Sequence, residues 1–69
     1  MPLTFAKEGE AASIKNVGGK EDVRKFLENL GFVTGANVTV ISETGGNLIV
    51  NIKDSRVAIG KDMASRIMV

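Results

Sequence analysis

The sequence predicts a mainly β fold, in which about six short strands curl into a small barrel with one inserted α-helix. Eight glycines divide the 69 residues into short segments. Most of these segments alternate apolar and polar side chains, the period of a strand with one buried face. Only residues 20–30 have the spacing of a helix. Short, twisted sheets lose their exposed edges by curling, which favours a barrel over an open sheet.

The chain is long enough for one domain and too short for two, so residues 1–69 are expected to form a single domain. Hydrophobic residues make up 43% and charged residues 25%, the balance of a globular domain rather than a disordered chain. The lack of cysteine and of an N-terminal signal segment fits a reducing cytoplasm. No apolar stretch approaches the roughly 20 residues that cross a bilayer. Any work at a membrane is therefore expected to go through a membrane protein.

The N-terminal segment is expected to form strands. Leu3 and Phe5 alternate with a polar residue, which predicts a short first strand. Residues 11–17 alternate less regularly and predict a second strand that ends at Gly18-Gly19.

Residues 20–30 are predicted to form the helix. Apolar side chains at i, i+3, i+4 and i+7 make a single stripe, which consists of Val23, Phe26, Leu27 and Leu30. Acidic residues in the first turn complement the helix dipole. Gly31 follows the stripe at the position where a left-handed residue ends many helices. Phe32 just beyond it is placed to close the helix end hydrophobically, and both Phe32 and Val33 are also candidates to stay partly exposed.

The second half of the chain predicts a meander of strands. Thr44-Gly45-Gly46-Asn47 is a tight hairpin signal between strands at residues 37–43 and 48–53. A turn at Asp54-Ser55, a strand at 56–60, a short helical turn near 61–65 and a last strand at 66–69 follow. The residues expected to face the core are Val38, Val40, Leu48, Val50, Ile52, Val57, Ile59, Ile67 and Val69. The expected architecture is an SH3-like barrel with the helix between its second and third strands.

Three segments of the chain resemble the FeoA family. The helix end from Phe26 to Phe32, followed by Gly35 and the strand from Val38, is similar to the family's central signature. Residues 14–19 are similar to its lead-in, and residues 64–69 to its closing segment. The resemblance extends over residues 3–69, and the positions that carry it are Gly19, Leu27, Gly31, Gly35, Val38, Ala64 and Ile67.

The resemblance implies a small cytoplasmic protein of bacterial ferrous-iron uptake with an SH3-like fold. It also implies contact with FeoB, the membrane transporter that has a cytoplasmic GTP-binding domain. A related domain at the C-terminus of some metal-dependent repressors serves as an interaction module. The family has no settled catalytic residues, so none is transferred to this chain.

The residue types present argue against catalysis and against tight metal binding. Nucleophilic catalysis needs an activated nucleophile beside a base, and the chain has neither His nor Cys. We expect no enzyme activity, no catalytic residue and no cofactor. Tight iron or zinc sites recruit imidazole or thiolate, whereas Glu8 with Glu10, or Glu21 with Asp22, would hold a metal only weakly. The glycine-rich segment 17–22 lacks the P-loop pattern and is interpreted as a turn.

Candidate partner-binding residues fall into a basic and an apolar group. Basic residues near the helix start lie off the apolar stripe, where they either solubilise the helix or meet an acidic partner. Ile41 and Ile49 lean outward by strand parity and form a contact surface unless the helix covers them. The full set is Lys20, Arg24, Lys25, Phe32, Val33, Ile41, Ile49 and Arg56, with Lys53 as a similar candidate.

Two classes of function remain open. The first is a regulatory module that docks on the FeoB transporter, with a weak homo-oligomer as a further possibility. The alternative is an SH3-like nucleic-acid-binding or repressor-type interaction module. Nucleic-acid binders usually carry a basic stripe interleaved with aromatic residues. This chain has a formal net charge of +1 and no Trp or Tyr, which makes nucleic acid the weaker alternative.

Overall fold

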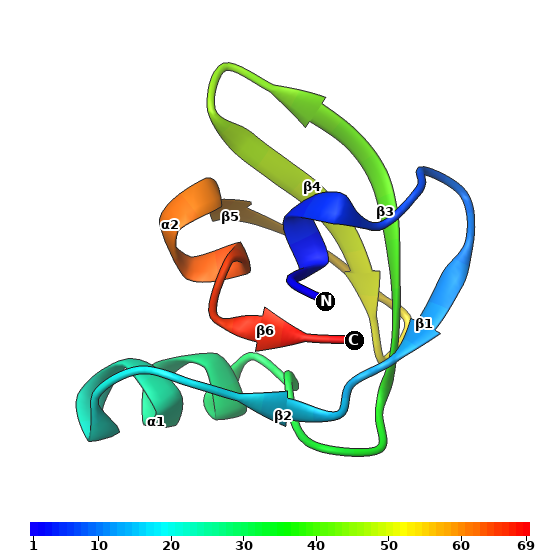
Figure 1. Cartoon of the computed structure of the whole chain (residues 1–69). Coiled ribbons are helices and arrows are strands. Elements are labelled where there is room, and N and C mark those ends of the chain that lie inside the picture. Colours follow the sequence, from blue (N-terminus) through cyan, green and yellow to red (C-terminus); the bar gives the residue numbers. More distant parts are fainter.

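The computed structural model describes all residues, 1–69. Six strands, two α-helices and one 3-10 helix follow one another along the chain (Figure 1). Their order is η1 (Leu3–Phe5), β1 (Ala11–Ser13), β2 (Asn16–Val17), α1 (Glu21–Asn29), β3 (Asn37–Thr44), β4 (Asn47–Ile52), β5 (Ser55–Gly60), α2 (Lys61–Ala64) and β6 (Ile67–Met68).

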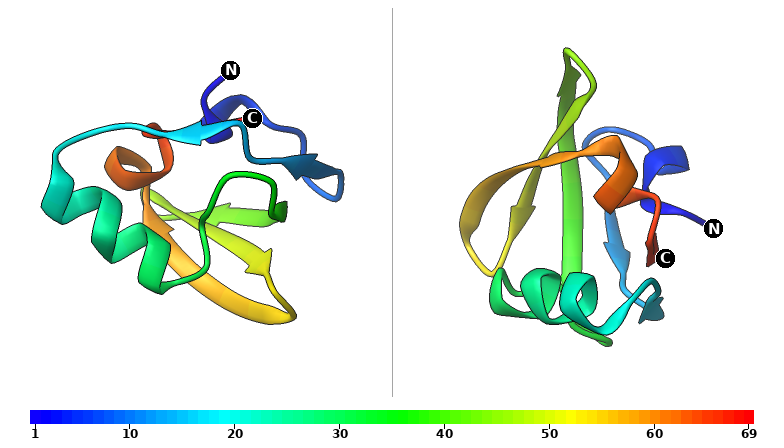
Figure 2. Two further views of the ribbon diagram at one scale, coloured as in Figure 1. Left: turned by 90° about the horizontal axis from the view of Figure 1, so that it is seen from below. Right: turned by 90° about the vertical axis from the view of Figure 1, so that its left-hand side faces the viewer.

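The strands form two small antiparallel sheets. The larger has the order β1-β3-β4-β5, and the smaller pairs β2 with β6. The turn between β3 and β4 lies at one end of the molecule and α1 at the other (Figures 1 and 2). The two termini lie side by side, because the Met1 amino group donates to the Val69 carbonyl at 2.8 Å and the Val69 N–H donates to the Met1 carbonyl at 2.8 Å.

Two tight turns set the register of the meander. Gly45 and Gly46 connect β3 to β4 with φ of +57° and +85°, the left-handed pair that matches the twist of a hairpin. Lys53 and Asp54 connect β4 to β5 with φ of +49° and +63°. Neither residue is glycine, so this second turn holds a conformation that L-residues seldom adopt. The predicted hairpin at 44–47 is confirmed, and the next turn lies one residue before the predicted one.

A single apolar core joins both sheets. Thirteen hydrophobic side chains are buried in one cluster, and no polar or charged residue is buried with them. The predicted core positions Val38, Val40, Leu48, Val50, Ile52, Ile59, Ile67 and Val69 all belong to it, while Val57 is half-buried against it. The remaining members are Leu3, Ile14, Leu27, Phe32 and Ala64. The alternation read from the second half of the chain is therefore confirmed.

The predicted first strand is wrong. Residues 3–5 form a 3-10 turn, in which the Phe5 N–H bonds the Pro2 carbonyl and the Ala6 N–H bonds the Leu3 carbonyl, each at 3.0 Å. The turn buries Leu3 completely and leaves Phe5 72% exposed. A strand would have placed both side chains on the same face. Three residues are too few for alternation to distinguish the two conformations.

The predicted second strand divides, and the barrel is not a closed ring of hydrogen bonds. The pairing of β1 with β3 ends at Ile14: its N–H still bonds the Ala36 carbonyl at 2.9 Å, in register with the ladder, but its carbonyl accepts from the Gly35 N–H at 2.8 Å instead of from Ala36. The Lys15 N–H then bonds the Met68 carbonyl at 2.7 Å, which starts the pairing of β2 with β6. One stretch of chain thus serves both sheets, and the sheets meet through the shared core.

The burial of two phenylalanines needed the structure to decide. Phe32 was a candidate both to close the helix end and to stay partly exposed, and it is completely buried, whereas Phe26 was placed in the buried stripe and is 50% exposed. Gly31, with φ of +107°, ends α1 by turning the chain inward. The Phe32 N–H bonds the Leu27 carbonyl at 3.0 Å and the Gly31 N–H bonds the Glu28 carbonyl at 2.9 Å. This is a Schellman motif, whose hydrophobic contact packs Phe32 beside Leu27.

Phe26 lies at the margin of the buried stripe because it is about 100° around the helix from Leu27. Leu27 is fully buried, and Val23 and Leu30 are partly buried against the core. The helix therefore buries a narrower face than its apolar spacing predicts.

We predict that Phe32→Ala lowers the free energy of unfolding by about 3–5 kcal/mol, because it removes a fully buried aromatic side chain. Phe26→Ala should cost below about 1 kcal/mol, since half of that side chain already faces water. Urea unfolding followed by circular dichroism measures both. Equal losses for the two variants would contradict the assignment.

We predict that replacing Lys53-Asp54 by Asn-Gly raises the free energy of unfolding by about 0.5–1 kcal/mol, because Asn and Gly tolerate positive φ. In a domain of this size each kcal/mol raises the Tm by about 4–8 °C. Asp54→Ala is the control, because it removes the carboxylate without relieving the backbone. Stabilisation by the control, or none by Asn-Gly, would contradict the prediction.

Candidate functional site

The candidate functional residues lie on two surfaces, the solvent side of α1 and the outer face of the larger sheet. The structure contains no pocket and no group of three or more His, Cys, Asp or Glu side chains that could hold a metal ion. The buried side chains of α1 and of the larger sheet fix these elements against the core, and their opposite sides form the two surfaces.

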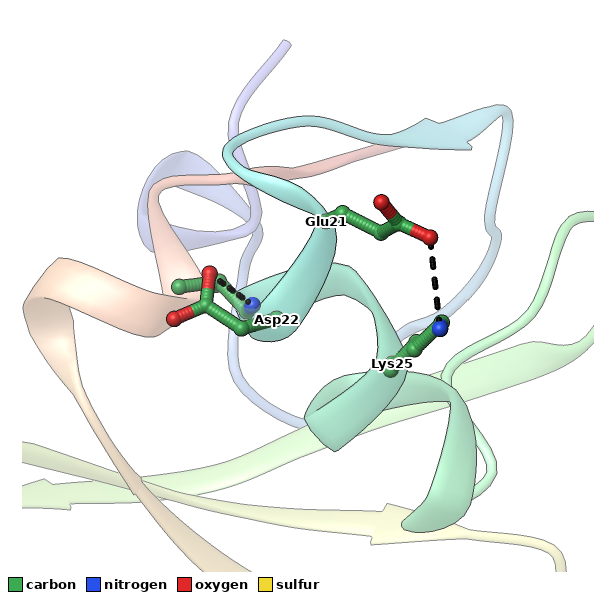
Figure 3. A network of polar contacts seen from close by, with 4 residues as sticks. Glu21, Asp22 and Lys25 are labelled. Atoms are coloured by element: carbon green, nitrogen blue, oxygen red, sulfur yellow. Dashed lines mark hydrogen bonds and ion pairs between the residues drawn. The ribbon is translucent and has the colours of Figure 1, made fainter.

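The basic group of α1 is exposed and partly neutralised. Lys20 precedes the first turn in an extended conformation, and Arg24 follows one turn later on the solvent side. The Lys25 Nζ lies 3.2 Å from the Glu21 carboxylate one turn earlier (Figure 3). The Lys25 and Glu21 side chains are 69% and 71% exposed, so this ion pair contributes little to stability. Lys20 and Arg24 have no ion-pair partner in the chain.

Three acidic side chains, two at the start of α1 and one on the sheet, already interact with a backbone N–H or a lysine of the chain. The Asp22 carboxylate accepts a hydrogen bond of 2.9 Å from the Val23 N–H, as Figure 3 shows. Glu21 faces Lys25, and on the sheet the Glu43 carboxylate lies 3.0 Å from the Lys61 Nζ. Glu21 and Asp22 point to different sides of the helix, so they do not form a joint oxygen site.

The outer face of the sheet brings Ile49 and Arg56 close together. Ile49 lies between Ser42 of β3 and Ala58 of β5. Arg56 lies opposite Asn51 in the next row. Ile49 is partly exposed and does not belong to the side chains packed against the core. Its predicted outward orientation is confirmed.

Ile41 is partly exposed because a β-bulge re-aims the strand. The pairing of β3 with β4 shifts between Val40 and Ser42, so Ile41 is the extra residue of β3. Val33, which follows the turn after α1, is also partly exposed. Phe32 leaves the candidate set, because a fully buried side chain offers no surface to a partner.

The structure also exposes apolar residues that the sequence reasoning missed. Met1, Phe5 and Phe26 are the large hydrophobic side chains left most exposed, at 58%, 72% and 50%. Phe5 escaped notice because residues 3–5 were interpreted as a strand, which would place Leu3 and Phe5 on the same face. The proline before Leu3 could have indicated a turn, since proline presets the first position of many turns.

The FeoA domain family model matches residues 1–69, the whole of the chain. The chain belongs to the FeoA family. The resemblance inferred from the glycine and aliphatic positions is thereby confirmed.

Relatives of known name support this membership. The chain is 37% identical over 68 residues to a protein of Methanocaldococcus jannaschii named "Putative Fe(2+) transport protein A", covering 99% of this chain and 83% of that protein. It is 33% identical to the crystal structure of an iron uptake regulatory protein (FeoA), with a TM-score of 0.91. That alignment covers 100% of this chain and 93% of the other.

A third comparison identifies the fold. The zinc complex of Stenotrophomonas maltophilia FeoA, described as a prokaryotic SH3 domain protein, is 25% identical, with a TM-score of 0.87. The alignment covers 100% of this chain and 88% of that one. This FeoA chain therefore has the expected mainly β, SH3-like fold, although its strands pair as two sheets. No helix in it is long and apolar enough to span a membrane.

We predict that this FeoA chain binds neither Fe²⁺ nor Zn²⁺ with micromolar affinity. It has no imidazole or thiolate, and its carboxylates Glu21, Asp22 and Glu43 already face cations or a backbone N–H. Isothermal titration calorimetry under anaerobic conditions measures the binding of each ion. One equivalent of either metal held with micromolar affinity would contradict the prediction.

Proposed function

We propose that this chain is a cytoplasmic accessory protein of ferrous-iron uptake, and that it acts by docking on the cytoplasmic part of a FeoB-type transporter. The observation that carries the proposal is the family match over residues 1–69, together with a relative named for Fe²⁺ transport. The protein has no reaction of its own in this account. It works through the surface that it presents.

The surface of the chain supports a docking role. Unpaired cations at Lys20 and Arg24 stand on the solvent side of α1. Aromatic side chains are frequent anchors at protein interfaces, and Phe26, on the same helix, is half exposed. A surface of this kind fits a protein partner that offers carboxylates beside apolar side chains.

Any effect on transport must come from a difference in affinity between two states of the transporter. A ligand that binds both states equally shifts no equilibrium, whereas a tenfold preference shifts it by about 1.4 kcal/mol. Docking can therefore favour one conformation of the cytoplasmic domain without any chemistry by this chain. The sign of the effect depends on which conformation is bound more tightly.

We predict that the chain, immobilised on a resin, retains FeoB from detergent-solubilised membranes, and that Arg24→Glu with Lys25→Glu weakens the retention. Reversing both charges replaces attraction to an acidic partner by repulsion. The Tm should fall only slightly, since both side chains are exposed and the Glu21–Lys25 pair contributes little.

Lys7→Glu is a single-site control, because Lys7 is an exposed cation outside α1. It changes the net charge in the same direction and should leave more of the retention intact. Failure of the unsubstituted chain to retain the transporter at any salt concentration would refute the proposed function.

A further inference from the structure

Strand β5 is the one long sheet edge that nothing in the chain covers. It forms the end of the larger sheet, paired only with β4. The other edges are short or protected: β1 has three residues, and β6 is bridged on its free side through Met68 to Pro2. In the right-hand view of Figure 2, β5 runs along the left margin of the molecule, with no ribbon beyond it.

The register of the β4–β5 hairpin determines which backbone groups face outward. The two-residue turn at Lys53-Asp54 makes Ile52 and Ser55 a hydrogen-bonded pair. Bonded and non-bonded pairs alternate along an antiparallel ladder. Residues 55, 57 and 59 therefore bond to β4, while Arg56 and Ala58 direct their N–H and C=O groups away from it.

The outward groups of Arg56 and Ala58 have no partner in the chain. None of the backbone hydrogen bonds outside the regular elements involves either residue, and no side chain reaches them. Both residues are exposed. The N–H and C=O groups of these two residues are therefore free along one edge, and an added strand binds to such groups.

We propose that the β5 edge binds an extended segment of a partner protein as an added antiparallel strand. The segment carries an acidic residue opposite Arg56 and, two residues earlier, a β-branched residue opposite Ala58. This inference rests on the proposed function only for the source of the segment, which is the cytoplasmic part of the transporter.

Side-chain rows of the sheet select these residue types. Arg56 has no carboxylate partner within the chain. It lies opposite Asn51 on β4, and a residue of an added strand would lie opposite it on the other side. A carboxylate directly across the new strand pair would supply that partner. Ile49 and Ala58 form the adjacent row. A β-branched side chain beside the small Ala58 would reach toward Ile49 and cover its exposed part.

A second copy of the chain fits this edge less well. Antiparallel self-pairing about Val57 places Ala58 opposite Arg56, and pairing about Ala58 places Gly60 there. Neither of these registers, which pair the largest part of β5, gives Arg56 an acidic neighbour, and pairing about Val57 brings the two arginines into diagonal proximity. The charge of the edge therefore favours a partner segment over a symmetrical dimer.

The test is an NMR titration of the ¹⁵N-labelled chain with the blocked peptide acetyl-Thr-Val-Thr-Glu-Thr-amide. A short added strand is expected to bind with a Kd of about 1 mM. The amide signals of Arg56 and Ala58 should shift and their hydrogen exchange should slow. No shift of these two signals up to about 10 mM peptide would overturn the proposal.

Two N-methylated peptides provide a matched pair of controls. In the proposed register the Val and Glu amides bond to β5, whereas the central Thr amide points away. Methylating the Val and Glu nitrogens should abolish binding, and methylating the central Thr nitrogen should leave most of it. Equal affinity of the two methylated peptides would overturn the strand-addition mode.

A charge exchange tests the role of Arg56. Arg56→Glu should weaken binding of the Glu peptide by at least about threefold, and a peptide with Lys in place of Glu should restore it. Unaltered affinity of the variant for both peptides would contradict the assigned register. Sedimentation of the unsubstituted chain adds a second check. A dimer that Arg56→Glu or Ala58→Pro dissociates would assign the edge to a second copy and overturn the proposal.

The proposed function and this inference can fail separately. Ala58→Pro removes one outward N–H while keeping an edge position that tolerates proline, and its fold is verified by the NMR spectrum. Equal retention of the transporter by this variant and by the unsubstituted chain overturns the inference alone. Peptide binding at β5 without any retention of the transporter overturns the proposed function and leaves the edge as a binding site.

Discussion

Val38 and Val40 of β3, with Val50 and Ile52 of β4, provide the inner face of the hairpin around which the domain is organised. The remaining elements add buried or partly buried side chains to the same cluster, from Leu3 near one terminus to Val69 at the other. Strands of two or three residues have too few hydrogen bonds to be stable alone. Burial against one apolar face therefore holds the short elements in position, and no buried polar group weakens it.

Sequence reasoning succeeded where the pattern was long and failed where it was short. The hairpin at 44–47 and the meander could be predicted because alternation extends over all six residues of β4 and over β3 up to the bulge at Ile41. Residues 3–5 were misassigned because an apolar–polar–apolar pattern of three residues is compatible with both a 3-10 turn and a strand. The burial of Phe32 depends on the left-handed turn at Gly31 and on the direction in which that turn sends the chain. The sequence indicated the turn but left the burial of Phe32 open.

The candidate surfaces show the same division. Outward orientation of Ile49 follows from strand parity, so it could be predicted before the structure was known. The open edge of β5 could not, because it depends on which strands become neighbours in the sheet. A barrel closed by hydrogen bonds would have hidden Arg56 and Ala58, whereas the division into two sheets leaves them unpaired. The departure from the expected barrel thus creates the feature most suited to binding.

Hydrogen–deuterium exchange of the chain, with and without purified, detergent-solubilised FeoB, is the decisive measurement of docking on the transporter. We expect slower exchange at surface amides in the complex, with amides of β3 and β4 inside the sheet unchanged. Identical exchange at every amide, with transporter in saturating excess, would contradict it.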